Sequence, residues 1–303
     1  MARISGLSLV GLSLSQLAEL IGPYIAHRGV KSCAPESTLE AFELAAVFRA
    51  EDQAQMIEFD VQLSLDNQLV VIHDETVDRT AHGLEEGKSH KVKDLTLAEL
   101  KELDAGLWFS KDFAGARIPS LEEVVDLCLK LNLLMNLEIK TSDRHPETES
   151  GLDQAQDIKI TKALISWLEK IKAENLDLFE KIFSRLLISS FSPEALYLVR
   201  EAFPKVNLAY LVEIKNWDQD WALRKAKIKA DMSALNCVSL NLNQDVFDLK
   251  HKEIRRAEIK EAAGSALLLA YTVNDFSRAE ELRREFGVSA VFTDKLVEEA
   301  CVM

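Results

Sequence analysis

The sequence of 303 residues predicts a closed (β/α)₈ barrel. Eight short apolar runs alternate with longer helical patterns, and the last five runs start about 20 to 30 residues apart. That spacing fits a strand plus a crossover helix and therefore a parallel sheet. An open doubly wound sheet is the alternative, but no G-x-G-x-x-G segment follows any run. The runs are Tyr24 to Ala26, Met56 to Val61, Leu134 to Ile139, Leu186 to Phe191, Asn207 to Val212, Val238 to Leu242, Leu267 to Thr272 and Ser289 to Thr293.

Helix boundaries between these runs are marked by capping residues. Three segments fit the capping box, in which two side chains satisfy free amides at the start of a helix: Ser37 to Glu40, Thr96 to Glu99 and Ser120 to Glu123. Ser192-Pro193 begins another helix, and Asn274-Asp275 and Gly287 bound the last one. The region from Lys215 to Asp231 is also interpreted as a helix.

The interval between the second and third runs is too long for a single crossover. Gln62 to His73, with Asp66-Asn67 at its turn, predicts an antiparallel hairpin. The polar stretch from Glu75 to Lys93 and two capped helices follow. We therefore expect a small inserted subdomain over about residues 62–118, within one domain that spans 1–303 and has its core at 24–296. The stretch from Thr141 to Asp157 is a second polar loop.

Composition excludes several classes of function. The chain is 48% hydrophobic with a formal net charge of −14, which argues against nucleic acid and anionic membranes as partners. Four widely spaced cysteines predict reduced thiols in a reducing compartment. They are Cys33, Cys128, Cys237 and Cys301. The first 22 residues read as a short helix rather than an export signal, and no long apolar run follows. We expect a cytoplasmic protein without a membrane span; nothing indicates an oligomer.

Ionisable residues gather where the first three predicted strands end, which is where active sites of parallel barrels lie. His27 and Arg28 follow the first strand. Glu58 and Asp60 share one face of the second, as do Glu138 and Lys140 on the third. His73-Asp74 arrive on the inserted hairpin, so their placement depends on how the insertion packs.

This set of residues favours phosphoryl transfer. Three converging carboxylates suit one divalent cation, Mg²⁺ or Ca²⁺. Arg28 and Lys140 offer positive charge to phosphate oxygens, and His27 and His73 can act as acid and base near neutral pH. Each residue alone also has a structural interpretation: a strand-end histidine often only forms hydrogen bonds, Asp74 can cap a turn, and Glu36 can sit in the first turn of a helix. The coincidence of all of them favours a site, in which we expect Glu36 and Asp74 to be supporting residues.

The chain resembles the glycerophosphodiester phosphodiesterases through motifs in order from residue 25 to 294. They include His27-Arg28-Gly29, Ala34 to Thr38, Ile57 to Val61, Val71 to Asp74, Arg79-Thr80, Leu103 to Phe109, Ile118 to Glu123, Asn136 to Lys140, Ser189 to Phe191, Tyr271 to Asn274 and Phe292 to Asp294. The resemblance implies a TIM barrel in which His27 and His73 are the acid–base pair. It implies Glu58, Asp60 and Glu138 as metal ligands, and Arg28 and Lys140 as phosphate-binding residues.

The implied reaction releases sn-glycerol 3-phosphate and an alcohol, such as choline or ethanolamine, through a cyclic phosphate. Three positions depart from the common pattern of this family: Ser37 stands for Asn, Tyr271 for Trp and Lys295 for Pro. Trp108, Phe191 and Tyr271 are expected to form a pocket wall, with ordinary barrel-rim packing as the alternative.

Two other functions stay open at this point. A relative acting on lysophospholipids or sphingolipids would use the same chemistry, although the polar stretch from Glu75 to Lys93 favours small soluble substrates. A non-catalytic barrel that binds phosphodiesters predicts loss of charged site residues, and none is lost.

Overall fold

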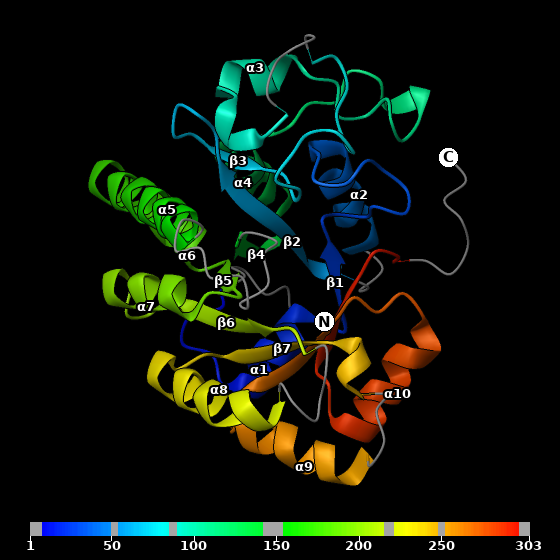
Figure 1. The fold of residues 1–303 in the computed structure, drawn as a ribbon, viewed down its shortest axis with the longest axis vertical. Coiled ribbons are helices and arrows are strands. Elements are labelled where there is room, and N and C mark those ends of the chain that lie inside the picture. Colours follow the sequence, from blue (N-terminus) through cyan, green and yellow to red (C-terminus); the bar gives the residue numbers. More distant parts are fainter. Residues whose placement is uncertain are drawn as a thin grey trace.

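The computed structural model describes residues 8–49, 54–84, 90–141, 154–214, 221–247 and 252–296. Parallel strands close a barrel in the order β1-β9-β8-β7-β6-β5-β4-β2, and β1 pairs with β2 to complete the ring (Figure 1). The predicted (β/α)₈ barrel is confirmed. The strands are β1 (Tyr24–His27), β2 (Ala54–Leu63), β3 (Leu69–Val71), β4 (Leu134–Ile139), β5 (Leu186–Ser190), β6 (Asn207–Val212), β7 (Ser239–Asn243), β8 (Leu267–Tyr271) and β9 (Ala290–Thr293).

Most helices cover the outside of the barrel, whereas α1 lies at its amino-terminal end and α3 in the insertion. They are α1 (Leu14–Ile21), α2 (Leu39–Arg49), α3 (Leu97–Glu102), α4 (Leu121–Leu131), α5 (Gln154–Glu174), α6 (Leu176–Phe183), α7 (Pro193–Ala202), α8 (Ala222–Leu235), α9 (Lys252–Ala263) and α10 (Phe276–Phe286). Thr96 and Ser120 form the predicted capping boxes, while Ser192 and Asp275 cap α7 and α10. Helix α8 overlaps the helix predicted over Lys215 to Asp231, of which residues 215–220 lie outside the described residues, and it ends four residues later, at Leu235.

The predicted capping box at Ser37 is wrong by one residue. The Oγ1 atom of Thr38 accepts the hydrogen bond from the backbone N–H of Ala41, so Thr38 caps α2. Ser37 has a φ of 57°, the left-handed conformation, and its hydroxyl is buried without a hydrogen-bond partner. A side-chain pattern does not reveal which of two adjacent hydroxyl residues carries the extended backbone that a cap requires.

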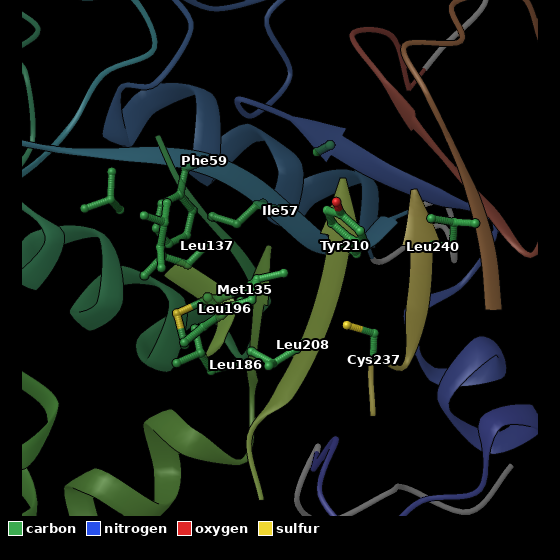
Figure 2. Packing of buried hydrophobic residues seen from close by; sticks show 14 of the residues in the cluster. Ile57, Phe59, Met135, Leu137, Leu186, Leu196, Leu208, Tyr210, Cys237 and Leu240 are labelled. Atoms are coloured by element: carbon green, nitrogen blue, oxygen red, sulfur yellow. The ribbon is translucent and has the colours of Figure 1, made fainter. Parts of the chain in front are cut away.

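The strands bury apolar side chains on both faces. Figure 2 shows the outer layer, in which Ile57 and Phe59 of β2 and Met135 and Leu137 of β4 point toward the surrounding helices. On the inner face, α1 packs against apolar residues near the amino ends of the strands. They include Ile25, Met56, Leu134, Leu187 and Ala209. Helix α1 therefore closes the amino-terminal end of the barrel and leaves the opposite end for the polar residues.

The predicted insertion begins with a hairpin. Strand β3 pairs antiparallel with β2, with Val61 opposite Val71, and Asn67 takes a φ of 58° in the connecting turn. The segment that contains β3 and α3 lies at the top of Figure 1 and has an apolar cluster of its own. This cluster includes Val70, Ile72, Val77, Val92, Leu95, Leu100 and Ile118. The division into one domain with an insertion stays a prediction, and residues 85–89 and 142–153 of the two predicted polar stretches lie outside the described residues.

The expectation of four reduced thiols is wrong at one position. Cys33 takes part in a disulfide, whereas Cys128 and Cys237 are free and buried; Cys301 lies outside the described residues. One support for the cytoplasmic prediction is thereby weakened, and the location stays a prediction. None of the helices in the described part of the chain is long and apolar enough to cross a membrane.

Candidate active site

The three acidic residues predicted to bind a metal lie together at the carboxyl end of the barrel. Register places Glu58 of β2 beside His27 of β1, and Asp60 of β2 beside Glu138 of β4. One carboxylate oxygen from each of Glu58, Asp60 and Glu138 lies within 4.8 Å of the others. Two residues from one strand and one from its neighbour thus form a single oxygen-rich group.

The electrostatics of this group fit a hard divalent cation. Glu58 and Asp60 are 2% and 1% exposed, and each has an oxygen without a hydrogen bond, Oε1 and Oδ2. Burial raises the pKa of Glu58 well above its usual value, and the neighbouring charges of Asp60 and Glu138 raise it further. Buried carboxylates that repel one another and have unused oxygens are the donor set that Mg²⁺ and Ca²⁺ take in proteins.

Two cationic side chains, those of Lys140 and Arg28, lie close to Asp60. Burial alone would raise the pKa of Asp60, but the Lys140 ammonium, followed by neighbours that include Arg28, lowers it to about 2. Lys140 Nζ is 3.3 Å from Asp60 Oδ1, and Arg28 Nε is 3.6 Å from Asp60 Oδ2. The two predicted phosphate-binding side chains therefore converge beside the acidic group.

His27 is held by a carboxylate that lies far away in the sequence. Its Nδ1 is 2.7 Å from Asp294 Oδ1, while its Nε2 is 3.9 Å from Glu58 Oε2. Burial lowers the pKa of His27 to about 4, outweighing the hydrogen bond with Asp294, which raises it. An imidazole whose Nδ1–H donates to a carboxylate presents Nε2 for proton transfer.

Asp294 is itself fixed by two further residues. Lys31 Nζ lies 3.0 Å from its Oδ1, and Asn274 Nδ2 donates to its Oδ2 at 2.8 Å. Burial would raise the pKa of Asp294, but the hydrogen bond with His27 and the charges of His27 and Lys31 hold it well below the usual range. The partner of His27 is therefore a carboxylate that stays ionised.

His73, which lies on the insertion, also has an aspartate as the partner of its Nδ1. Its Nδ1 is 2.7 Å from Asp74 Oδ1. The side-chain amide of Gln62, on β2, donates to the backbone oxygens of Ile72, His73 and Asp74 at 2.9, 3.1 and 2.7 Å. Although His73 lies on the insertion, its imidazole is held by Asp74 and its backbone by Gln62, a residue of a barrel strand.

Arg28 and Glu36, on the loop after β1, form an ion pair. Arg28 Nη1 donates to Glu36 Oε1 at 2.9 Å, and the backbone N–H of Arg28 donates to Glu58. The chain then turns sharply at Gly29, which has a φ of 81°; a Cβ there would lie 2.7 Å from that of Ala41. Only glycine lets this loop fold back tightly against α2.

Two of the three predicted wall residues pack against each other. The rings of Phe191 and Tyr271 are 5.9 Å apart at 89°, and the Tyr271 hydroxyl donates to the backbone oxygen of Val212. Trp108 packs instead on Phe109 within the insertion. The structure therefore joins Phe191 and Tyr271, and places Trp108 in a separate aromatic cluster.

Sequence reasoning did not select Asp294, Lys31, Asn274, Gln62 or Arg79 as site residues. One signal was available for Asp294. It directly follows the last predicted strand, and in a closed barrel that strand lies beside the first, which ends at His27. Arg79 lies in the Arg79-Thr80 motif of the resemblance, but neither this motif nor the position of Gln62 indicates a partner, because the partners depend on how the insertion folds back.

Comparisons with known proteins identify the family of this chain. The model of the glycerophosphoryl diester phosphodiesterase family matches residues 27–298. Glycerophosphodiester phosphodiesterase of Caldanaerobacter subterraneus subsp. tengcongensis is 41% identical over 190 residues, 62% of this chain and 66% of that protein. That of Bacillus subtilis (strain 168) is 30% identical over 278 residues, 89% of this chain and 82% of that protein.

A solved structure agrees with these relatives. It is a phosphodiesterase of Oleispira antarctica in complex with the product sn-glycerol-3-phosphate, with a TM-score of 0.69 and 28% identity over 93% of this chain and 96% of that one. The prediction of a phosphodiesterase enzyme is confirmed. The chain belongs to the glycerophosphoryl diester phosphodiesterase family.

Proposed function

We propose that this enzyme hydrolyses glycerophosphodiesters, such as glycerophosphocholine and glycerophosphoethanolamine, to sn-glycerol 3-phosphate and an alcohol. The observation that carries the proposal is a pair of imidazoles near one group of three carboxylates. The Nδ1 atoms of His27 and His73 form hydrogen bonds with Asp294 and Asp74. Small-molecule binding is further supported by the product bound in the related Oleispira antarctica structure.

One divalent cation, Mg²⁺ or Ca²⁺, belongs to this proposal. Glu58, Asp60 and Glu138 would hold it, because an oxygen of each lies close to the others, and Glu58 and Asp60 each have an oxygen without a hydrogen bond. When bound, the cation stabilises negative charge on the phosphate oxygens as a Lewis acid. Arg28 and Lys140 then contact the substrate phosphate from the same side of the barrel, where both already lie beside Asp60.

The two imidazoles divide the proton transfers between them. A hydroxyl of the substrate's glycerol attacks phosphorus, and one imidazole takes its proton. The bond between phosphorus and the alcohol oxygen breaks, and the other imidazole gives a proton to that oxygen. Water then opens the cyclic phosphate with the two imidazoles in exchanged roles, which releases sn-glycerol 3-phosphate.

Release of glycerol 3-phosphate from glycerophosphocholine tests the proposal. We expect activity that a chelator removes and that added Mg²⁺ or Ca²⁺ restores. Removing either member of an acid–base pair should lower kcat by about 10²- to 10⁴-fold, so His27→Ala and His73→Ala are the test variants. Glu58→Ala should weaken binding of the metal, so that activity falls and more Mg²⁺ or Ca²⁺ is needed for half-maximal activity. Full activity in these variants, or in the chelated enzyme, contradicts the proposal.

A matched control is available on the insertion. His90 pairs with Asp78 as His73 pairs with Asp74, but both His90 and Asp78 are more than half exposed. His90→Ala should therefore keep wild-type kcat. Lysophosphatidylcholine assayed in parallel distinguishes the soluble diester from a lipid substrate, and faster turnover of the lipid would favour the lysophospholipid alternative.

A further inference from the structure

One arginine joins the insertion to the barrel through two carboxylates. Arg79 Nε donates to Asp74 Oδ2 at 2.6 Å, and its Nη2 donates to Asp74 Oδ1 at 3.0 Å. Its Nη1 and Nη2 donate to Glu36 Oε2 and Oε1, both at 2.8 Å. Four of the five N–H groups of the guanidinium fork are used in this way.

Both carboxylates hold side chains of the proposed site. Asp74 bonds to Nδ1 of His73, and Glu36 accepts from Nη1 of Arg28 at 2.9 Å. A continuous chain of hydrogen bonds therefore runs from His73 through Arg79 to Arg28. It connects a proton-transfer group on the insertion with a phosphate-binding group on the barrel.

We propose that Arg79 is a positioning residue that orients His73 relative to Arg28, and this inference rests on the proposed function. Arg79 is suited to this role and not to binding substrate, because its donors are already directed at Asp74 and Glu36. Because the ammonium group of a lysine is a compact point charge without the planar fork of a guanidinium, a lysine at this position could not bridge the two carboxylates in this geometry.

Arg79 contributes little to the packing that holds the fold together. Its side chain is 46% exposed, and the insertion has an apolar cluster of its own. The β2–β3 pairing and the Gln62 side chain hold the backbone around His73 independently of Arg79. Loss of Arg79 should therefore disturb the orientation of Asp74 and Glu36 while the chain stays folded.

Arg79→Gln and Arg79→Lys test the proposal. A misplacement of about 1 Å can cost about 10²-fold in rate, so we expect kcat for glycerophosphocholine to fall by that order in Arg79→Gln, with a smaller fall in Arg79→Lys. The melting temperature of each variant shows whether it is folded. Arg117→Gln is the control, since Arg117 lies on the same insertion and, among the described residues, donates to the backbone oxygens of Glu102 and Leu103 and to no group of the proposed site. This variant should keep wild-type kcat.

A double-mutant cycle separates positioning from a purely structural role. If Arg79 acts through His73, Arg79→Gln should lower kcat by less than about threefold in the His73→Ala background. An equal loss in both backgrounds, or full activity of folded Arg79→Gln, overturns the inference. If the wild type itself releases no glycerol 3-phosphate, or His73→Ala is fully active, it is the proposed function that fails.

Discussion

The carboxylate of Asp294 determines which nitrogen of His27 carries the proton. Its Oδ1 faces Nδ1 of His27 at 2.7 Å and Nζ of Lys31 at 3.0 Å, while its Oδ2 accepts from Nδ2 of Asn274. All three neighbouring groups donate a hydrogen bond to Asp294, whose ionised carboxylate has two oxygens that can only accept. Asn274 cannot turn its amide over, because its Oδ1 accepts the backbone N–H of Asp294.

Asp294→Asn should therefore lower kcat by more than its small change in side-chain shape suggests. One orientation of the new amide sets its NH₂ against the NH₂ of Asn274. The other sets it against Lys31 and His27, so that Nδ1 must accept and Nε2 keeps the proton. Enforcing the wrong tautomer costs about 10⁴-fold in a serine protease triad, so we expect kcat to fall by about 10³- to 10⁴-fold, or about 4 to 5 kcal/mol.

Glycerol 3-phosphate release by wild type, Asp294→Asn and Asp294→Ala measures this effect. Asp294→Ala leaves Nδ1 open to water and enforces no tautomer, so its loss should be smaller, about 10²-fold. Melting temperatures show whether each variant is folded. A kcat of Asp294→Asn within tenfold of wild type, or a larger loss in Asp294→Ala than in Asp294→Asn, would refute a role of Asp294 in setting the tautomer.

Three further predictions concern the surroundings of the site. Ser37→Asn should raise the free energy of unfolding by about 0.5 to 1 kcal/mol in urea titrations, because asparagine tolerates the left-handed φ of 57° better than serine; an unchanged midpoint would contradict this. Gln62→Leu should lower kcat by about 10- to 10²-fold with little change in KM, since it removes the amide that holds the backbone of His73; a wild-type kcat would show that β3 pairing alone suffices. For Glu36, burial would raise the pKa, but the hydrogen bond from Arg79 and the charge of Arg28 lower it from 4.5 to about 2. The contribution of ionised Glu36 to the free energy of unfolding is therefore complete above pH 4.5 and is lost as the pH falls toward 2. The difference in free energy of unfolding between wild type and Glu36→Gln should shrink by on the order of 3 kcal/mol in that window. A difference that does not change with pH would show that it does not come from the ionised Glu36 carboxylate.

The barrel strands were predictable because each is a local pattern. The bounds expected for Leu134–Ile139 and Asn207–Val212 are those of β4 and β6. The hairpin after β2 was equally local, since Asp66-Asn67 supplies a turn with a left-handed residue. The cap of α2 was misplaced because φ, and not residue type, decides between Ser37 and Thr38.

The candidate site was predictable to the extent that its residues lie at strand ends. Register alone brings Glu58, Asp60 and Glu138 together. Asp74, the partner of His73, was named from the sequence, whereas Asp294 and Arg79 were not selected as site residues for a physical reason. Asp294 reaches His27 through ring closure, and Arg79 reaches Glu36 through the packing of the insertion. Both residues lie in motifs of the family resemblance, but their contacts depend on the tertiary structure and could not be inferred from those motifs alone.

The ten-residue strand β2 has a consequence for how this enzyme can vary. It carries Glu58 and Asp60 in its middle and Gln62 near its end, and β3, paired alongside, leads directly into His73. The separation between the acidic group and this histidine is therefore a property of one small piece of sheet. The remainder of the insertion, from Thr76 onward, is linked to this piece of sheet by the apolar cluster that includes Val70 and Ile72 and by the hydrogen bonds of Arg79. Changes in the outer insertion that keep this cluster, and an arginine that reaches Asp74 and Glu36, should therefore leave the separation between the acidic group and His73 unchanged.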